Sequence, residues 1–108
     1  KTDNQLYWRK NITEFQKDFA SIDKSGAEWL VENGIHLIGI DYLSIQRFYD
    51  GPETHQVLLG NEVVIVETLN LENVTQGWYD LICLPLKILG SEGSPVRAIL
   101  KLKSNEEV

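Results

Sequence analysis

The clearest pattern of apolar and polar positions lies in residues 22–32, where apolar residues recur every three or four positions. This spacing predicts an amphipathic helix. We expect Ser21 to supply the N-cap oxygen and Asp23 to place negative charge in the first turn. Asn33 and Gly34 follow the last apolar position and are typical of a left-handed cap that ends a helix.

Two short apolar runs after this helix predict strands. Residues 35–40 are apolar without alternation, which is typical of a strand buried on both faces, and Asp41 stands at its carboxyl end. Residues 62–69 are rich in β-branched side chains and predict a second buried strand. Between them, residues 53–59 follow a Gly-Pro turn and predict a short helix. This order of elements indicates α/β layering.

The last third of the chain predicts an antiparallel hairpin. Residues 78–84 form a third hydrophobic run, and Pro85 indicates that this strand ends at an edge or a bulge. Residues 90–94 are rich in glycine and serine and predict the turn, and residues 95–102 return as the final strand. Residues 104–108 form an acidic tail that we expect to fray. Residues 1–20 are expected to be irregular, with large aromatic side chains that pack over a core edge or into a neighbouring chain.

Composition excludes several classes of function. Ten basic residues against sixteen acidic residues give a net charge of −6, which argues against binding to nucleic acid or to an anionic membrane surface. The apolar runs are far shorter than the roughly 20 residues needed to cross a bilayer. The single cysteine, Cys83, cannot form an internal disulfide and is compatible with a reducing compartment, so we expect a cytoplasmic protein.

The candidate chemistry rests on His55 and Glu67. His55 lies in the first turn of the predicted short helix, and Glu67 lies near the carboxyl end of the strand that follows. Side chains so placed can converge, and an imidazole nitrogen with a carboxylate oxygen is a common partial ligand set for zinc or manganese. The alternative is that Glu67 reaches solvent while His55 caps or packs.

Five blocks of sequence occur in a fixed order between residues 21 and 100. They are Gly-Ile-His-Leu-Ile-Gly-Ile-Asp-x-x-Ser at 34–44, His-x-x-Leu-Leu at 55–59, Val-Ile-Val-Glu-x-Leu-x-Leu at 64–71, Leu-Pro-Leu-Lys-Ile at 84–88 and Gly-Ser-Pro-Val-Arg-Ala at 93–98. Together they resemble the C-terminal half of the cyclase family of metal-dependent hydrolases, which includes kynurenine formamidase and isatin hydrolase.

The resemblance implies a fold and a site. The fold would be α/β, with a swivelling β/β/α-type layered or barrel-like mixed sheet and flanking helices. Residues 1–108 would form the C-terminal portion of a single domain. His55 and Glu67 would be metal ligands that complete a site with an N-terminal motif of the form His-x-Gly-Thr-His-x-Asp-x-Pro-x-His, which this chain lacks.

Three further residues are candidates for the surroundings of that site. Asp41 and Ser44 match a family motif and would hydrogen-bond near the metal pocket, although both also suit a local turn cap. Trp8 would border the substrate pocket, with packing over the core as the alternative. No catalytic acid or base is assignable in this half.

The resemblance also implies the activity. The chain would be part of a metal-dependent amidohydrolase that cleaves an aryl-formamide or a small cyclic amide through a metal-activated water. We expect it to need its N-terminal half or a partner chain, and to form a homo-oligomer, since removing half of such a sheet would leave unpaired edges. The alternative is a catalytically silent remnant that serves as an interaction or structural module.

Overall fold

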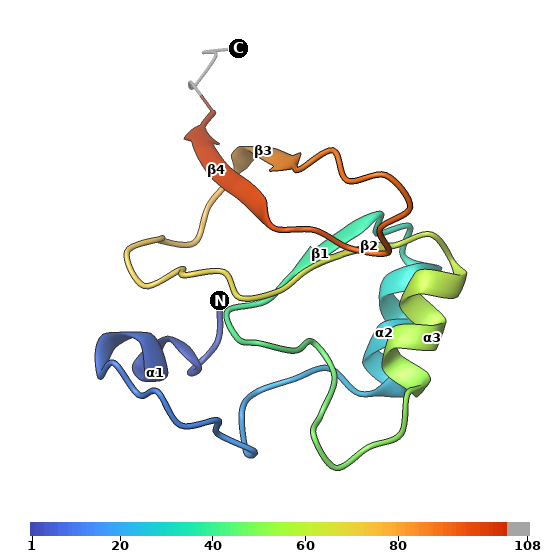
Figure 1. Ribbon diagram of the computed structural model, residues 1–108, viewed down its shortest axis with the longest axis horizontal. Coiled ribbons are helices and arrows are strands. Elements are labelled where there is room, and N and C mark those ends of the chain that lie inside the picture. The colour runs from blue at the N-terminus through green and yellow to red at the C-terminus, as the bar shows by residue number, and fades with distance from the viewer. Residues whose placement is uncertain (104–108) are drawn as a thin grey trace. The chain divides into compact units, whose positions relative to one another are not determined.

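The computed structural model describes residues 1–103, so the predicted fraying tail lies outside the described residues. The helices are α1 (Gln5–Arg9), α2 (Lys24–Glu32) and α3 (Glu53–Gly60), and the strands are β1 (Leu37–Gly39), β2 (Val64–Val66), β3 (Tyr79–Pro85) and β4 (Val96–Leu102) (Figure 1). The chain divides into two units, Lys1–Asn73 and a second that begins at Val74. The first unit contains the three helices and a two-stranded sheet, and the second contains the other two-stranded sheet. The chain is therefore of the mixed α/β type.

The first unit is built around a parallel pair of strands. β1 pairs with β2 in the register Leu37 to Val64, Ile38 to Ile65 and Gly39 to Val66. Parallel strands need a crossover connection, and here that connection contains α3. α2 and α3 lie side by side (Figure 1). The buried core consists of Ala27, Ile40, Ile45, Leu58 and Val63.

The cap of α2 differs from the prediction. Asp23, and not Ser21, is the N-cap residue, because its backbone is extended and its side chain accepts a hydrogen bond from the Gly26 backbone N–H at 2.8 Å. That N–H is the main cause that holds the pKa of the Asp23 carboxyl below its usual value of 3.8. The predicted C-terminal cap is confirmed, since Gly34 has φ +70°.

The two central strands are shorter than predicted. Glu62 has φ +59° and Thr68 has φ +64°, and a residue in the left-handed region cannot continue a strand. β2 is therefore limited to Val64–Val66, which lie among the five residues between these positions. Residues 62–69 were expected to form a buried strand, and this is only partly so, because the Val66 side chain is buried while the Val64 side chain is 53% exposed. Burial on both faces was expected for residues 35–40, but the three residues of β1 are only half-buried.

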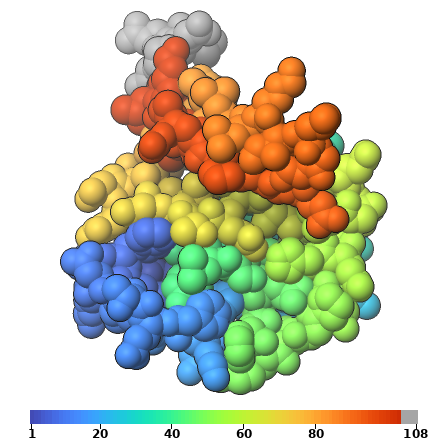
Figure 2. All heavy atoms as spheres, in the orientation of Figure 1, coloured from blue at the N-terminus to red at the C-terminus, as the bar shows by residue number. Residues whose placement is uncertain are grey.

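The N-terminal segment is more ordered than predicted, since it contains α1. The buried side chain of Asn4 fixes this segment: its Nδ2 donates to the Ala20 carbonyl at 2.8 Å, and its Oδ1 accepts from the Ala20 N–H at 2.7 Å. The aromatic rings of this segment then pack on Tyr42, with Phe19 at 4.7 Å between ring centroids. In Figure 2 the blue N-terminal segment and the green turn after β1 accordingly lie against each other.

The second unit contains the predicted antiparallel hairpin. β3 and β4 pair over seven residues each, from Tyr79 opposite Leu102 to Pro85 opposite Val96. Pro85 is the last residue of β3, as its missing N–H requires. Many of the large apolar side chains in this unit are exposed: Trp78, Leu81, Ile82, Leu84, Leu86, Ile88, Leu89, Val96, Ile99, Leu100 and Leu102. Within residues 1–103, no helix is long and apolar enough to span a membrane.

Candidate metal site

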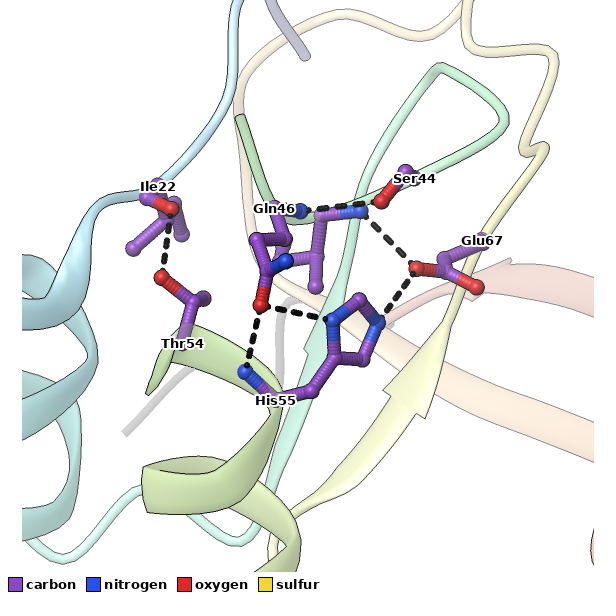
Figure 3. Close-up of polar contacts among 7 residues, drawn as sticks. Ile22, Ser44, Gln46, Thr54, His55 and Glu67 are labelled. Atoms are coloured by element: carbon purple, nitrogen blue, oxygen red, sulfur yellow. Dashed lines mark hydrogen bonds and ion pairs between the residues drawn. The ribbon is translucent and has the colours of Figure 1, made fainter. Parts of the chain in front are cut away.

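The structure brings His55 and Glu67 together. His55 lies in the first turn of α3, and Glu67 is the residue that follows β2. The His55 Nε2 atom is 3.3 Å from Glu67 Oε1 (Figure 3). The side chains are 34% and 32% exposed, so the pair lies where a bound ion or a substrate could reach it. The predicted convergence is confirmed, while a role in metal binding stays a prediction.

The side chain of Gln46 contacts two atoms of His55. The Gln46 side-chain oxygen accepts the backbone N–H of His55 at 3.2 Å, and the same oxygen lies 3.0 Å from His55 Nδ1. A backbone N–H can only donate, so the Gln46 atom that it meets is the amide oxygen, which can only accept. Nδ1 is therefore placed to donate to Gln46 in the tautomer that carries the proton on Nδ1.

This assignment leaves Nε2 facing a carboxylate. In a neutral imidazole with the proton on Nδ1, Nε2 has a free lone pair. That lone pair and Glu67 Oε1 are both acceptors, and at 3.3 Å they repel unless a positive charge is shared between them. The charge can be a proton on Nε2 or a cation bound by both groups. The donor set, one imidazole nitrogen and one carboxylate oxygen, fits a divalent cation of the zinc or manganese type.

Two features position Glu67, one at its carboxylate and one at the backbone of the next residue. The Ile45 backbone N–H donates to Glu67 Oε1 at 2.9 Å. The next residue, Thr68, has φ +64°, and its N–H donates to the Tyr42 carbonyl at 2.7 Å. A β-branched residue is uncommon in the left-handed region, and such strain persists only where surrounding contacts enforce it. The strained turn therefore sets the direction in which the chain leaves β2 at Glu67.

Asp41 and Ser44 have different positions relative to this pair. The Ser44 hydroxyl accepts the Gln46 N–H at 3.1 Å, so it caps a local turn and supports Gln46 directly (Figure 3). Asp41 is fully buried, and its carboxylate accepts the Thr2 N–H at 2.8 Å and the Thr2 hydroxyl at 2.7 Å. Asp41 thus anchors the N-terminal segment through the hydrogen bonds described.

Trp8 is part of the same anchor. Its indole N–H donates to the Asp41 carbonyl at 2.8 Å, and the side chain is half-buried. This contact agrees with the packing alternative for Trp8. A hollow in the first unit lies elsewhere, at the start of α2 and α3, and is lined by Asp23, Lys24, Ser25, Glu28, Asp50, Gly51, Glu53 and Thr54.

The pair supplies only part of a coordination shell. Within residues 1–103, no group of three or more His, Cys, Asp or Glu side chains is arranged to hold a metal ion. Structural and catalytic zinc sites use three or four protein ligands. His55 and Glu67 are therefore two candidate ligands and not a complete set of this kind.

Gln46 was missed by the sequence analysis. It lies nine residues before His55, and no local motif connects the two. One signal was present: α3 begins after Pro52, whose side chain has no oxygen to cap the first amides of the helix. Those amides need acceptors, and a polar side chain from elsewhere had to supply one.

Comparison with known proteins finds relatives that cover most of this chain. No protein-family model matches the chain. Cyclase-like protein 3 of Oryza sativa subsp. japonica is 50% identical over 101 residues, which cover 92% of this chain and 36% of that protein. Cyclase-like protein 1 of Arabidopsis thaliana is 48% identical, over 92% of this chain and 38% of its own length. Kynurenine formamidase of Bordetella petrii is 40% identical over 85 residues, which are 78% of this chain and 41% of that enzyme.

Solved structures agree with these relatives. A potential metal-dependent hydrolase with cyclase activity superimposes with a TM-score of 0.82 at 33% identity, over 93% of this chain and 47% of that one. A predicted metal-dependent hydrolase from Bacillus stearothermophilus gives a TM-score of 0.81, also at 33% identity, over 93% of this chain and 46% of that one.

The solved structures that this fold matches are described as metal-dependent hydrolases, and the sequence relatives are named cyclase-like proteins or kynurenine formamidase. The chain is similar to part of the cyclase-family proteins, as the resemblance in its sequence blocks indicated. The chain spans between 36% and 41% of the length of the curated relatives named above.

Proposed function

We propose that this chain is part of a metal-dependent amidohydrolase in which His55 and Glu67 bind a divalent cation, zinc or manganese. One observation carries the proposal: Nε2 of His55 faces Glu67 Oε1 at 3.3 Å while Nδ1 is committed to Gln46. The remaining ligands would come from an N-terminal half of the same enzyme or from a partner chain, and we propose a homo-oligomer in the cytoplasm. The layered or barrel-like sheet would then be complete only in the whole assembly.

The residues of this chain would bind and orient the cation. His55 would act as a neutral ligand through Nε2, and Glu67 would contribute negative charge from a carboxylate that the Ile45 N–H holds in place. A divalent cation bound here would lower the pKa of a coordinated water and polarise an amide carbonyl. The partial exposure of both side chains leaves room for a small substrate to approach.

The substrate class is an aryl-formamide or a small cyclic amide, cleaved by water to a carboxylic acid and an amine. The name of one relative, kynurenine formamidase, supports an aryl-formamide. Both substrate types present a planar carbonyl that a cation can polarise.

A second candidate is a catalytically silent module that keeps the fold for interaction. It is favoured by the lack, within residues 1–103, of any three-ligand group. In that case His55 and Glu67 would form a plain ion pair, which at a half-exposed position contributes about 0–1 kcal/mol to stability.

Metal analysis tests the proposal against this alternative. The purified chain, alone and with any N-terminal partner, would be equilibrated with zinc or manganese, and the bound metal counted. We expect a stoichiometric ion in the assembled protein that is lost in both His55→Ala and Glu67→Ala. His36→Ala is the matched control, since His36 is exposed and is the only other histidine of the sequence. Equal metal content in all four proteins would favour the silent module.

A further inference from the structure

We propose that Gln46 is a positioning residue that fixes the tautomer of His55 and so dedicates Nε2 to the cation. The inference rests on the proposed function only for the cation that Nε2 would bind. The effect of Gln46 on the tautomer of His55 can be measured in the metal-free chain. Gln46 does not face Glu67 in the contacts described and would act through His55.

The geometry of one oxygen carries the proposal. Gln46 Oε1 accepts two hydrogen bonds from the same residue, from the backbone N–H of His55 at 3.2 Å and from its Nδ1–H at 3.0 Å (Figure 3). The backbone bond excludes the flipped amide, since a flipped Gln46 would oppose an NH₂ group to the N–H of His55. With the amide fixed, the ring nitrogen beside it must donate.

The same oxygen caps α3. His55 is the third residue of α3, and its N–H has no partner within the first turn of the helix. A side chain at the N-cap normally accepts such an N–H, but the N-cap here is Pro52. Gln46 replaces the missing cap from outside the helix. A single atom, Gln46 Oε1, therefore both caps the start of α3 and orients the imidazole ring.

The backbone at Gln46 is itself fixed on both sides. Its N–H donates to the Ser44 hydroxyl at 3.1 Å, and it forms an isolated parallel bridge with Ile22. The preceding residue, Ile45, is fully buried and holds Glu67 Oε1 through its N–H at 2.9 Å. Two consecutive residues therefore position the two candidate ligands, one through a backbone amide and the other through a side chain. Outer contacts of this kind orient metal ligands in many sites.

Nitrogen NMR of the metal-free chain tests the tautomer directly. With ¹⁵N-labelled histidine at an alkaline pH where imidazole is neutral, long-range proton–nitrogen correlations show which ring nitrogen carries the proton. We expect His55 to carry it on Nδ1, with His36 as an exposed internal reference in the same spectrum. Gln46→Ala should convert His55 to a mixture of both tautomers. Gln46→Glu should retain the Nδ1–H form, because a carboxylate oxygen accepts the same two bonds.

Metal affinity gives the second measurement. Loss of an outer partner of a histidine ligand lowers metal affinity about 10- to 100-fold, and we expect this loss in Gln46→Ala but not in Gln46→Glu. Gln56→Ala is the matched control, since Gln56 is exposed on the same helix. A merely structural role of Gln46 would lower stability in Gln46→Ala without altering the tautomer.

The outcomes separate this inference from the proposed function. A wild-type His55 with its proton on Nε2, or a tautomer that Gln46→Ala leaves unchanged, overturns the role of Gln46 even if metal binds. A wild-type Nδ1–H form that Gln46→Ala disrupts supports that role even if the assembled protein binds no metal, in which case the proposed function fails alone. If Gln46→Ala does not fold, the wild-type and Gln46→Glu spectra still decide.

Discussion

The two units of the chain differ in how their apolar residues are used. In the first unit, Ala27, Ile45 and Leu58 are fully buried and make one core with the residues around them. In the hairpin of the second unit, Leu84 is 59% exposed and Leu102 is 71% exposed. A two-stranded hairpin is marginal by itself, so its backbone pairing needs further cover for stability. The candidate ligands His55 and Glu67 belong to the unit that has a core. One core residue, Ile45, donates its backbone N–H to Glu67.

The largest effect that separates the two units should come from matched leucine truncations. Leu58→Ala removes a fully buried side chain of α3, and we expect it to lower the free energy of unfolding by about 2–5 kcal/mol. Leu84→Ala removes a mostly exposed side chain of β3 and should change the free energy of unfolding by no more than about 0.5 kcal/mol. Urea unfolding followed by circular dichroism measures both. Similar losses in the two variants would contradict the contrast between the units.

A smaller effect should come from the strained turn beside Glu67. Thr68→Gly relieves a left-handed backbone that costs an L-residue about 1–2 kcal/mol, offset by about 0.5–1 kcal/mol of glycine entropy. We expect a net gain in stability of up to about 1.5 kcal/mol, measured by the same unfolding experiment.

The control for this turn is Thr13→Gly. Thr13 is exposed and is not among the residues with positive φ, so glycine there should bring no gain. If Thr68→Gly lowers stability as much as Thr13→Gly does, Thr68 is not strained. If Thr68→Gly raises stability but weakens metal binding, the left-handed conformation of Thr68 helps to position the candidate ligand Glu67.

The smallest effect concerns the cap of α2. The folded-state pKa of Asp23 is lowered, chiefly by the Gly26 N–H, so the cap stabilises the fold fully above the ordinary pKa of 3.8. That contribution is lost as pH falls through the lower folded-state pKa. The free energy of unfolding would be measured from neutral pH to below the folded-state pKa of Asp23. It should fall less at low pH in Asp23→Asn than in the wild type. An identical pH dependence in the two proteins would contradict the assigned cap.

The sequence predicted the elements better than their ends. The helical spacing of residues 22–32 and the β-branched run around Ile65 were sufficient to place α2, which begins at Lys24, and β2. The limits of β2 were not predictable, because the left-handed conformations of Glu62 and Thr68 are imposed by tertiary contacts and neither residue type favours them. The N-cap of α2 was misplaced by two residues since Ser21 and Asp23 are both good caps.

The candidate site was predictable in part for a similar reason. His55 and Glu67 belong to consecutive elements, and a helix-to-strand step allows their side chains to meet. Gln46 comes from a turn outside both elements, and its role depends on a double hydrogen bond that no sequence spacing encodes. Local patterns find residues on regular elements, whereas long-range polar contacts appear only in the folded chain.

We propose that Nε2 of His55 and the carboxylate of Glu67 share one divalent cation. Anomalous diffraction at the zinc or manganese edge, from crystals of the assembled protein grown with the metal, tests it most directly. The account predicts an anomalous peak about 2.0–2.2 Å from both His55 Nε2 and a Glu67 oxygen. A peak at other residues, or His55 bonded directly to Glu67 with no metal between them, would contradict it.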